Sequence, residues 1–223
     1  MSRPTTVVFD VNETLTDMRP LADRFEQVGA PGWMAQLWFA SLLRDAFALT
    51  AAGATAPFAT LAEGALRSVL AKVTPDREID AAVRHVLAAL SALSLHPDVV
   101  EGVTALRDRG LRLTTLTNGS AAMTELLLTT AGLREKFAAV LSVQDAGVWK
   151  PSPAAYLYAA SRCAVDPAEM VLVAVHPWDV DGAMRAGLAG AWLNRTGEPY
   201  PAYFTAPTWQ AQDLRELADL IAP

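Results

Sequence analysis

The sequence lacks the features that mark secreted, membrane-bound and nucleic-acid-binding proteins. Its one cysteine, Cys163, cannot form an internal disulfide, so we expect a reducing compartment and interpret this residue as a small buried hydrophobe. The polar start lacks the apolar stretch of a signal peptide, and no later apolar run reaches the about 18 residues of a transmembrane helix. Lys and Arg do not cluster, and the net charge is −6. We therefore expect a cytoplasmic protein that binds neither nucleic acid nor membrane.

What the sequence does contain is enough apolar material for a large folded core. Hydrophobic residues make up 52% of the 223 residues and charged residues 19%, which excludes a disordered chain. Short runs rich in apolar and β-branched residues predict strands at residues 5–9, 111–116, 138–143, 170–175 and 191–193. Helical patterns alternate with them at residues 99–109, 120–130, 153–163, 180–186 and 214–221. This alternation predicts an α/β fold with a Rossmann-like parallel sheet covered on both faces.

A long helical segment separates the first predicted strand from the others. From residue 18 to residue 95, Ala, Leu, Arg and Glu dominate, and breakers such as Pro31-Gly32 divide the segment into about four helices. We therefore predict a core domain made of residues 1–17 and 96–223. A helical cap of the four-helix type, residues 18–95, is inserted after the first strand.

Polar residues follow several of the predicted strands, at the sheet edge where open parallel sheets bind ligands. These loops are Asp10-Val11-Asn12-Glu13-Thr14, Thr117-Asn118-Gly119-Ser120, Lys150-Pro151-Ser152-Pro153 and His176-Pro177-Trp178-Asp179-Val180-Asp181. Taken singly, the carboxylates and hydroxyls could be helix caps or first-turn acids, and the lysine could be a solvated surface residue. These alternatives would have to hold independently at every one of the loops. The convergence of the loops on one sheet edge therefore favours an active site.

The same loops resemble the motifs of one enzyme superfamily. Val8-Phe9-Asp10-Val11-Asn12-Glu13-Thr14-Leu15 looks like the first motif of the haloacid dehalogenase superfamily. Leu116 to Ser120 looks like the second, Lys150-Pro151 the third, and Trp178-Asp179 the fourth. Order and spacing fit over essentially the whole chain. The segments from Lys150 to Tyr156 and from Trp192 to Gly197 are similar to the L-2-haloacid dehalogenase (type II) branch.

The resemblance implies a catalytic role for four residues, and His176, which stands outside the family pattern, is a fifth candidate. Asp10 would attack carbon, displace halide and form an ester that water then hydrolyses, a task that suits a carboxylate ionised at neutral pH. Lys150 would hold Asp10 ionised, and Thr14 would donate a hydrogen bond to it. Asp179 would orient or activate the water. His176 is either a second base, a hydrogen-bond partner of a nearby carboxylate, or structural.

The resemblance also implies how a small substrate would be held. Thr117 and Asn118 would bind a substrate carboxylate together with the N–H groups of the following helix, Tyr156 would contact Asp10 or its surroundings, and Trp178 would form an apolar wall. With Asn12 and Phe39, the candidate substrate-binding residues are Asn12, Thr117, Asn118, Phe39, Tyr156 and Trp178. The cap would cover the site and exclude water.

Four positions depart from the dehalogenase pattern. Phe39 stands where those enzymes have a cap arginine that receives the halide, and His176 lies in a segment where they have a serine and an asparagine. Asn12-Glu13 replaces their Tyr-Gly; a glutamate is unusual beside a nucleophile, and one interpretation is that Glu13 faces away from it. Asn12 also argues against a phosphatase, because those relatives carry an aspartate there that protonates the leaving group, which an amide cannot do.

Three hypotheses follow. The first is a hydrolase of the 2-haloacid dehalogenase type, acting on a small 2-substituted carboxylic acid through an aspartyl ester. The second is a phosphatase or phosphonate hydrolase of the same superfamily, and only this one would bring in magnesium; otherwise no cofactor or metal is expected. The third is a drifted member that serves as a binding protein. The family's habit suggests a homodimer, and the expected partner is a small molecule.

Overall fold

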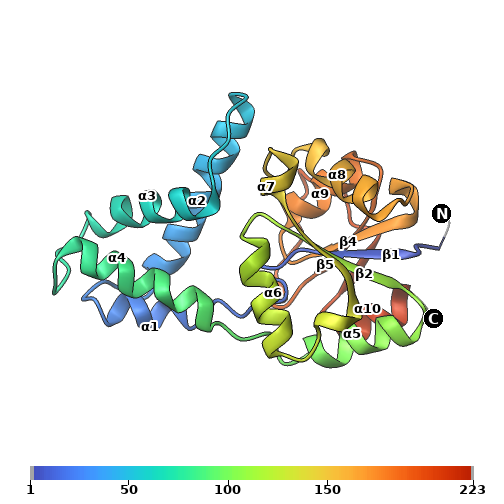
Figure 1. Cartoon of the computed structure of the whole chain (residues 1–223), viewed down its shortest axis with the longest axis horizontal. Coiled ribbons are helices and arrows are strands. Elements are labelled where there is room, and N and C mark those ends of the chain that lie inside the picture. The colour runs from blue at the N-terminus through green and yellow to red at the C-terminus, as the bar shows by residue number, and fades with distance from the viewer. Residues whose placement is uncertain (1–2, 222–223) are drawn as a thin grey trace. The chain divides into compact units, whose positions relative to one another are not determined.

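The computed structural model describes residues 3–221 and divides the chain into two compact units. The first unit combines the chain up to Thr16 with the chain from Leu95 onward, and the second is Asp17–Ser94. Figure 1 traces the elements of both. None of the described helices is long and apolar enough to cross a membrane.

The first unit is built on a six-stranded sheet in which every neighbouring pair of strands is parallel. The strand order is β3-β2-β1-β4-β5-β6. The strands are β1 (Thr6–Phe9), β2 (Arg112–Thr117), β3 (Phe137–Ser142), β4 (Met170–Ala174), β5 (Ala189–Leu193) and β6 (Trp209–Ala211). The predicted α/β class and parallel sheet are thus confirmed. The sequence patterns missed β6, which has only three residues, too few for a periodicity to be recognised.

Helices cover both faces of this sheet. They are α5 (Val99–Asp108), α6 (Ala121–Thr130), α7 (Val143–Ala146), α8 (Pro153–Cys163), α9 (Pro177–Arg185) and α10 (Leu214–Ile221), with 3-10 turns η2 (Arg134–Lys136) and η3 (Pro167–Glu169). The helix predicted over residues 180–186 begins earlier in the structure. Pro177 is its first residue, a position where proline is favoured because it needs no N–H partner.

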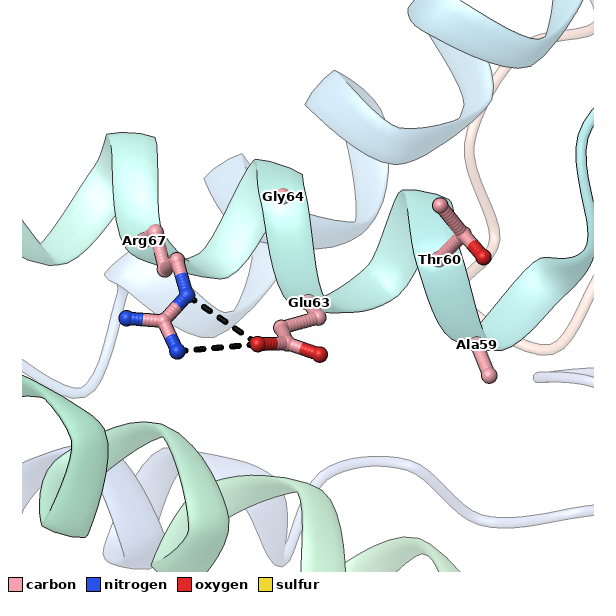
Figure 2. Close-up of a pocket in the computed structure, with 5 residues that line it drawn as sticks. All are labelled: Ala59, Thr60, Glu63, Gly64 and Arg67. Atoms are coloured by element: carbon pink, nitrogen blue, oxygen red, sulfur yellow. Dashed lines mark hydrogen bonds and ion pairs between the residues drawn. The ribbon is translucent and has the colours of Figure 1, made fainter.

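The second unit is the helical insertion expected after the first strand. It contains α1 (Leu21–Glu26), α2 (Met34–Ala51), α3 (Phe58–Leu70), α4 (Ile79–Ala88) and the 3-10 turn η1 (Ala89–Ala92). Trp38 of α2 is fully buried, and its Nε1–H donates to the carbonyl oxygen of Ala62 in α3 at 2.9 Å. A hollow of about 340 Å³ lies along α3, and Figure 2 shows Arg67 paired with Glu63 on its lining. The hollow is lined by one helix and carries no buried polar cluster.

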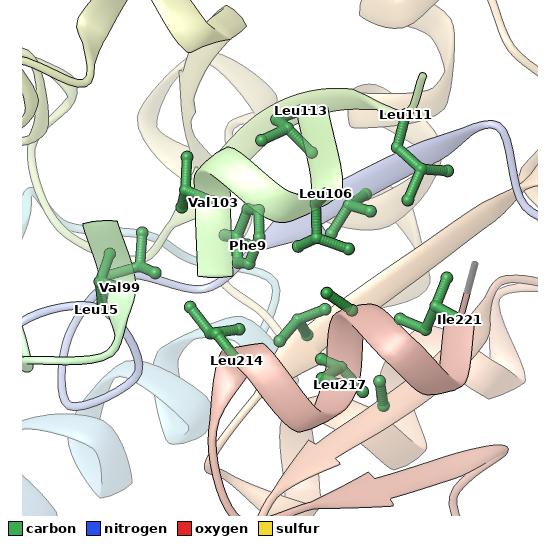
Figure 3. Close-up of a cluster of buried hydrophobic side chains, with 14 of the residues drawn as sticks. Phe9, Leu15, Val99, Val103, Leu106, Leu111, Leu113, Leu214, Leu217 and Ile221 are labelled. Carbon is green, nitrogen blue, oxygen red and sulfur yellow. The ribbon is translucent and has the colours of Figure 1, made fainter. Parts of the chain in front are cut away.

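The hydrophobic core of the first unit lies between the sheet and helices α5 and α10. Figure 3 shows Phe9 of β1 and Leu113 of β2 among the leucines and valines of these helices. Burying each such side chain stabilises the fold by about 1.5–3 kcal/mol. Gly102 lets α5 and α10 approach closely, since a Cβ there would lie 2.3 Å from the Cβ of Leu214. This packing fixes β1 in the middle of the sheet. Asp10, the residue directly after β1, therefore has a defined position at the carboxyl edge of the sheet.

Candidate active site

The site lies beside β1 and β4, the two neighbouring strands from which the chain continues toward opposite edges of the sheet. The chain runs outward from β1 through β2 to β3, and on the other side from β4 to β5 and β6. Ligands of open α/β sheets bind at such a switch point, outside the carboxyl ends of the strands. Asp10 directly follows β1, and its backbone N–H donates to the carbonyl oxygen of Val173 in β4 at 3.0 Å. His176 lies just after β4, at the N-cap of α9.

Asp10 is buried, with 4% of its surface exposed, and both of its carboxylate oxygens accept hydrogen bonds. Oδ1 accepts from Nζ of Lys150 at 2.8 Å. Oδ2 accepts from Oγ1 of Thr14 at 2.7 Å and lies 3.2 Å from Nδ1 of His176. Thr14 is itself oriented, because its Oγ1 accepts the backbone N–H of Val175 at 3.1 Å. The carboxylate therefore has one orientation.

Lys150 is fully buried and joins Asp10 to a second carboxylate. Its Nζ lies 2.6 Å from Oδ2 of Asp179 in the first turn of α9. Oδ1 of Asp179 accepts a 2.6 Å hydrogen bond from the hydroxyl of Tyr156 in α8. Gly182 allows this approach of α9 to α8, since a Cβ there would lie 2.7 Å from the Tyr156 hydroxyl oxygen. An ammonium between two carboxylates satisfies charges that would otherwise be costly to bury.

The backbone of Lys150 is held in place by the loop after β2. Oδ1 of Asn118 accepts the N–H of Lys150 at 3.0 Å, and Nδ2 of Asn118 donates to the carbonyl oxygen of Lys150 at 3.4 Å. Oγ1 of Thr117 accepts the N–H of Gly119 at 2.9 Å. Thr117 and Asn118, expected to bind a substrate carboxylate, thus make hydrogen bonds within the protein. Their role in substrate binding stays a prediction, and in it the substrate carboxylate would be bound mainly by the backbone N–H groups beside them.

His176 links Asp10 to a third carboxylate. Its Nε2 lies 2.7 Å from Oε2 of Glu13, while its ring stacks on Trp178 with centroids 5.1 Å apart. Glu13 has a φ of 63°, in the left-handed region that disfavours side chains, and its carbonyl oxygen lies 2.9 Å from Nε2 of His96. The Glu13 carboxylate thus meets His176 and reaches the nucleophile only through that ring, so the interpretation that Glu13 faces away from Asp10 stays a prediction.

The charges of the cluster shift the pKa values of its members in opposite directions. Burial raises the pKa of Asp10, but Lys150 and His176 outweigh this and hold it far below its ordinary value. Burial lowers the pKa of Lys150, yet the charges of Asp10 and Asp179 raise it above its ordinary value. Burial and the charge of Asp10 raise the pKa of Asp179. Asp10 is therefore the ionised member, and Asp179 the one closer to taking up a proton.

His176 is held in its protonated form. Burial lowers its pKa, but the hydrogen bonds and charges of Asp10 and Glu13 raise it to about 10. Both ring nitrogens face carboxylate oxygens, which only accept hydrogen bonds when ionised. A cation therefore occupies this position at neutral pH.

The residues present do not fit a divalent metal. Among residues 3–221, no three His, Cys, Asp or Glu side chains are grouped so that they could hold one. Every carboxylate oxygen of Asp10 and Asp179 already accepts from Lys150, Thr14, Tyr156 or His176. A magnesium ion between the carboxylates would have to displace the Lys150 ammonium.

The structure thus brings together most of the residues expected from sequence. Asn12 lies at the same edge, because a Cβ on Gly119 would be 3.3 Å from its Nδ2. Trp178 contacts the site through His176. Phe39 lies in the helical insertion, buried and beside Trp38, so its substrate role stays a prediction.

Two residues that support the site were not among the candidates expected from sequence. One is Glu13, and the fact that Glu13 and His176 both depart from the family pattern could have indicated that they contact each other. The other is Arg195, which donates from Nη2 to the carbonyl oxygen of Thr14 at 3.0 Å and from Nη1 to Asp98 at 2.8 Å. No local pattern around Arg195 indicates a contact with a loop so far away in the chain.

Comparisons with known proteins identify the family of the chain. A family model described as haloacid dehalogenase-like hydrolase matches residues 4–187. The (S)-2-haloacid dehalogenase 4A of Burkholderia cepacia is 31% identical over 219 residues, which cover 96% of this chain and 94% of that protein.

Solved structures extend the likeness to the whole fold. A dehalogenase with an intermediate complex superposes with a TM-score of 0.92 at 28% identity, covering 100% of this chain and 99% of the other. The L-2-haloacid dehalogenase of Xanthobacter autotrophicus with chloropropionic acid covalently bound superposes with a TM-score of 0.85 at 27% identity, covering 98% of each chain.

Proposed function

Because this chain belongs to the haloacid dehalogenase-like hydrolases, we propose that it is a 2-haloacid dehalogenase that uses Asp10 as its nucleophile. The substrate is a small carboxylic acid with halide on carbon 2. The observation that carries the proposal is the buried carboxylate of Asp10, kept ionised by the Lys150 ammonium 2.8 Å away. Because the Lys150 ammonium compensates the cost of burying it, the carboxylate stays ionised and can attack carbon without a general base.

In the first step an oxygen of Asp10 forms a bond to carbon 2, and the carbon–halogen bond breaks with its electron pair leaving on the halide. Lys150 keeps Asp10 deprotonated until that bond forms. In the second step water adds to Cγ of the ester, and cleavage of the Cγ–O bond releases the 2-hydroxy acid. Asp179, whose pKa is raised by burial and by Asp10, takes one proton of the water and passes it to the leaving alkoxide of the product, and the second proton is released from the Asp10 carboxyl to solvent as the carboxylate is restored. Tyr156 orients Asp179 through its 2.6 Å hydrogen bond.

The second step predicts where the oxygen of water goes. Because water attacks Cγ, one oxygen of Asp10 is exchanged in each turnover. A single turnover in heavy-oxygen water should therefore label Asp10 and leave the first molecule of product unlabelled. Labelled product with unlabelled Asp10 would contradict covalent catalysis.

A substrate panel tests the reaction class. Both enantiomers of 2-chloropropionate, together with chloroacetate and phosphoesters, should be offered to wild type, to Asp10→Asn and to the exposed control Asp108→Asn. We expect halide release by wild type and by the control, and none by Asp10→Asn. Phosphate release that depends on Asp10 would replace this proposal with the phosphatase alternative, against which Asn12 and the occupied carboxylates argue.

A further inference from the structure

The two oxygens of Asp10 have unequal surroundings. Oδ2 is contacted by two donors, the Thr14 hydroxyl at 2.7 Å and Nδ1 of His176 at 3.2 Å, whereas among residues 3–221 only Lys150 donates to Oδ1, at 2.8 Å. A carboxylate oxygen has about two lone-pair sites. Those of Oδ2 are both used, so Oδ1 is the oxygen with a lone pair left for attack on carbon.

The choice of oxygen decides which atom becomes the ester carbonyl. If Oδ1 bonds to the substrate, Oδ2 becomes the carbonyl oxygen and keeps Thr14 and His176 as its neighbours. When water adds to Cγ, the π electron pair of the carbonyl moves onto Oδ2. Donors fixed at a developing oxyanion are the arrangement by which enzymes stabilise tetrahedral intermediates of acyl transfer.

We propose that His176, together with Thr14, forms the oxyanion hole for hydrolysis of the Asp10 ester, and that Glu13 keeps His176 positioned and protonated. This role rests on the proposed aspartyl ester. His176 is then an electrophilic catalytic residue and not the base; the proton of the attacking water goes to Asp179.

The geometry around the ring excludes a neutral imidazole. Nδ1 faces Oδ2 of Asp10 and Nε2 faces Oε2 of Glu13 at 2.7 Å. A neutral ring would turn the lone pair of one nitrogen toward a carboxylate oxygen, whereas the imidazolium donates to both. The charged groups that face the ring include these two carboxylates, the Trp178 indole stacks on it, and Lys150 acts on it through Asp10.

The charge changes along the reaction in the direction that catalysis needs. Ester formation removes the negative charge of Asp10, so His176 binds the neutral ester weakly. The tetrahedral intermediate restores a negative charge on Oδ2 at the same place. The interaction is thus stronger in the transition state of hydrolysis than in the ester, which is the condition for accelerating that step. The contact of Glu13 with Nε2 involves none of the reacting atoms, so it holds the ring in place throughout both steps.

The test separates the two half-reactions with (S)-2-chloropropionate under enzyme excess, by rapid quench. Halide release reports ester formation, and the intact mass of the protein reports the ester and its decay. Nδ2 of an asparagine occupies the place of Nδ1, so His176→Asn keeps the donor but has no base, whereas His176→Leu has neither. We expect the ester to form in both variants, to decay about 10²–10³-fold more slowly in His176→Leu, and to decay at an intermediate rate in His176→Asn, which keeps a donor but not its charge.

A pH profile of ester decay gives a second readout. A cationic donor is lost as pH rises through the pKa of His176, so the wild-type rate should fall on the alkaline side. Glu13→Gln removes a charge that raises this pKa, and the alkaline fall should move to lower pH. In His176→Asn the fall should be absent, because the amide does not titrate. If His176 were the base, the rate would instead rise as pH passes through the pKa of His176, and it would be lost equally in both His176 variants.

The possible outcomes distinguish the roles of His176 and test the proposed function. Equal slowing in His176→Asn and His176→Leu, or a rate of ester decay that still rises as pH passes through the pKa of His176, would overturn the oxyanion role in favour of a His176 base. Decay at the wild-type rate in His176→Leu would remove His176 from this step. If His176→Leu does not fold, the pH profiles of His176→Asn and Glu13→Gln still decide. Absence of any ester in wild type would refute the proposed function itself.

Discussion

Replacing Lys150 with methionine should destabilise the first unit strongly and in a pH-dependent way. Its Nζ lies 2.8 Å from Asp10 and 2.6 Å from Asp179, and all three side chains are nearly or fully inaccessible to solvent. At these separations each charge pair contributes about 6 kcal/mol of attraction at an effective dielectric constant of about 20. Much of this only offsets the desolvation of the charges. Removing one partner of a buried pair costs about 3–5 kcal/mol, because an uncompensated charge is left behind.

The sign of the pH dependence follows from the pKa directions. In wild type, Lys150 holds the pKa of Asp10 below its ordinary value. That contribution is present at neutral pH and is lost as pH falls through the lowered pKa. Without the ammonium, two buried carboxylates face each other, and burial and repulsion raise their pKa values. The variant should then lose stability as pH rises through these raised values, and the deficit against wild type should shrink as the pH is lowered from 8 to 5.

Urea unfolding followed by tryptophan fluorescence at several pH values measures this deficit. Lys72→Met is the matched control, because Lys72 is exposed and its replacement should change the free energy of unfolding by less than about 0.5 kcal/mol. A deficit for Lys150→Met of about 1 kcal/mol or less, the range of exposed ion pairs, would refute the reasoning. So would a deficit that grows on acidification.

Two other predictions concern single contacts of the site. Tyr156→Phe removes the 2.6 Å hydrogen bond to Asp179, worth about 1.5–3 kcal/mol to a charged acceptor. Rapid-quench kinetics should show about 10–100-fold slower ester decay with unchanged halide release, while the half-buried control Tyr158→Phe, on the same helix but outside the site, changes neither. At Glu13, whose φ is 63°, both Gly and Ala remove the partner of His176 and should slow ester decay equally. Gly relieves the left-handed strain, so Glu13→Gly should be more stable to urea than Glu13→Ala by about 1 kcal/mol; equal stability would mean that the backbone there is unstrained.

Much of the fold was readable from the sequence because its signals are local. A run such as Thr6–Phe9, β-branched and aromatic, is stable mainly as a strand buried on both faces. Strands that alternate with helices can only be joined by right-handed crossovers into a parallel sheet. Three-residue β6 escaped detection because it carries no period, and it pairs only through tertiary contact with β5.

The loops of the site were also identifiable, since parallel strands bring their carboxyl ends to one edge. That reasoning could name Asp10 and Lys150 but could not assign their hydrogen bonds. Nothing local in the sequence indicates that Asn118 turns its amide to the backbone of Lys150, or that Thr14 and His176 share one oxygen of Asp10. Contacts across such sequence separations depend on how whole strands and helices pack.

The sequence by itself thus determined the order of strands and helices and the loops that carry reactive side chains, because periodicity and residue type act over a few residues. Only the tertiary structure decided how those side chains are oriented. The clearest case is Glu13, whose left-handed backbone turns its carboxylate onto His176. The strain of that conformation is compensated by contacts from segments more than 80 residues away in the chain.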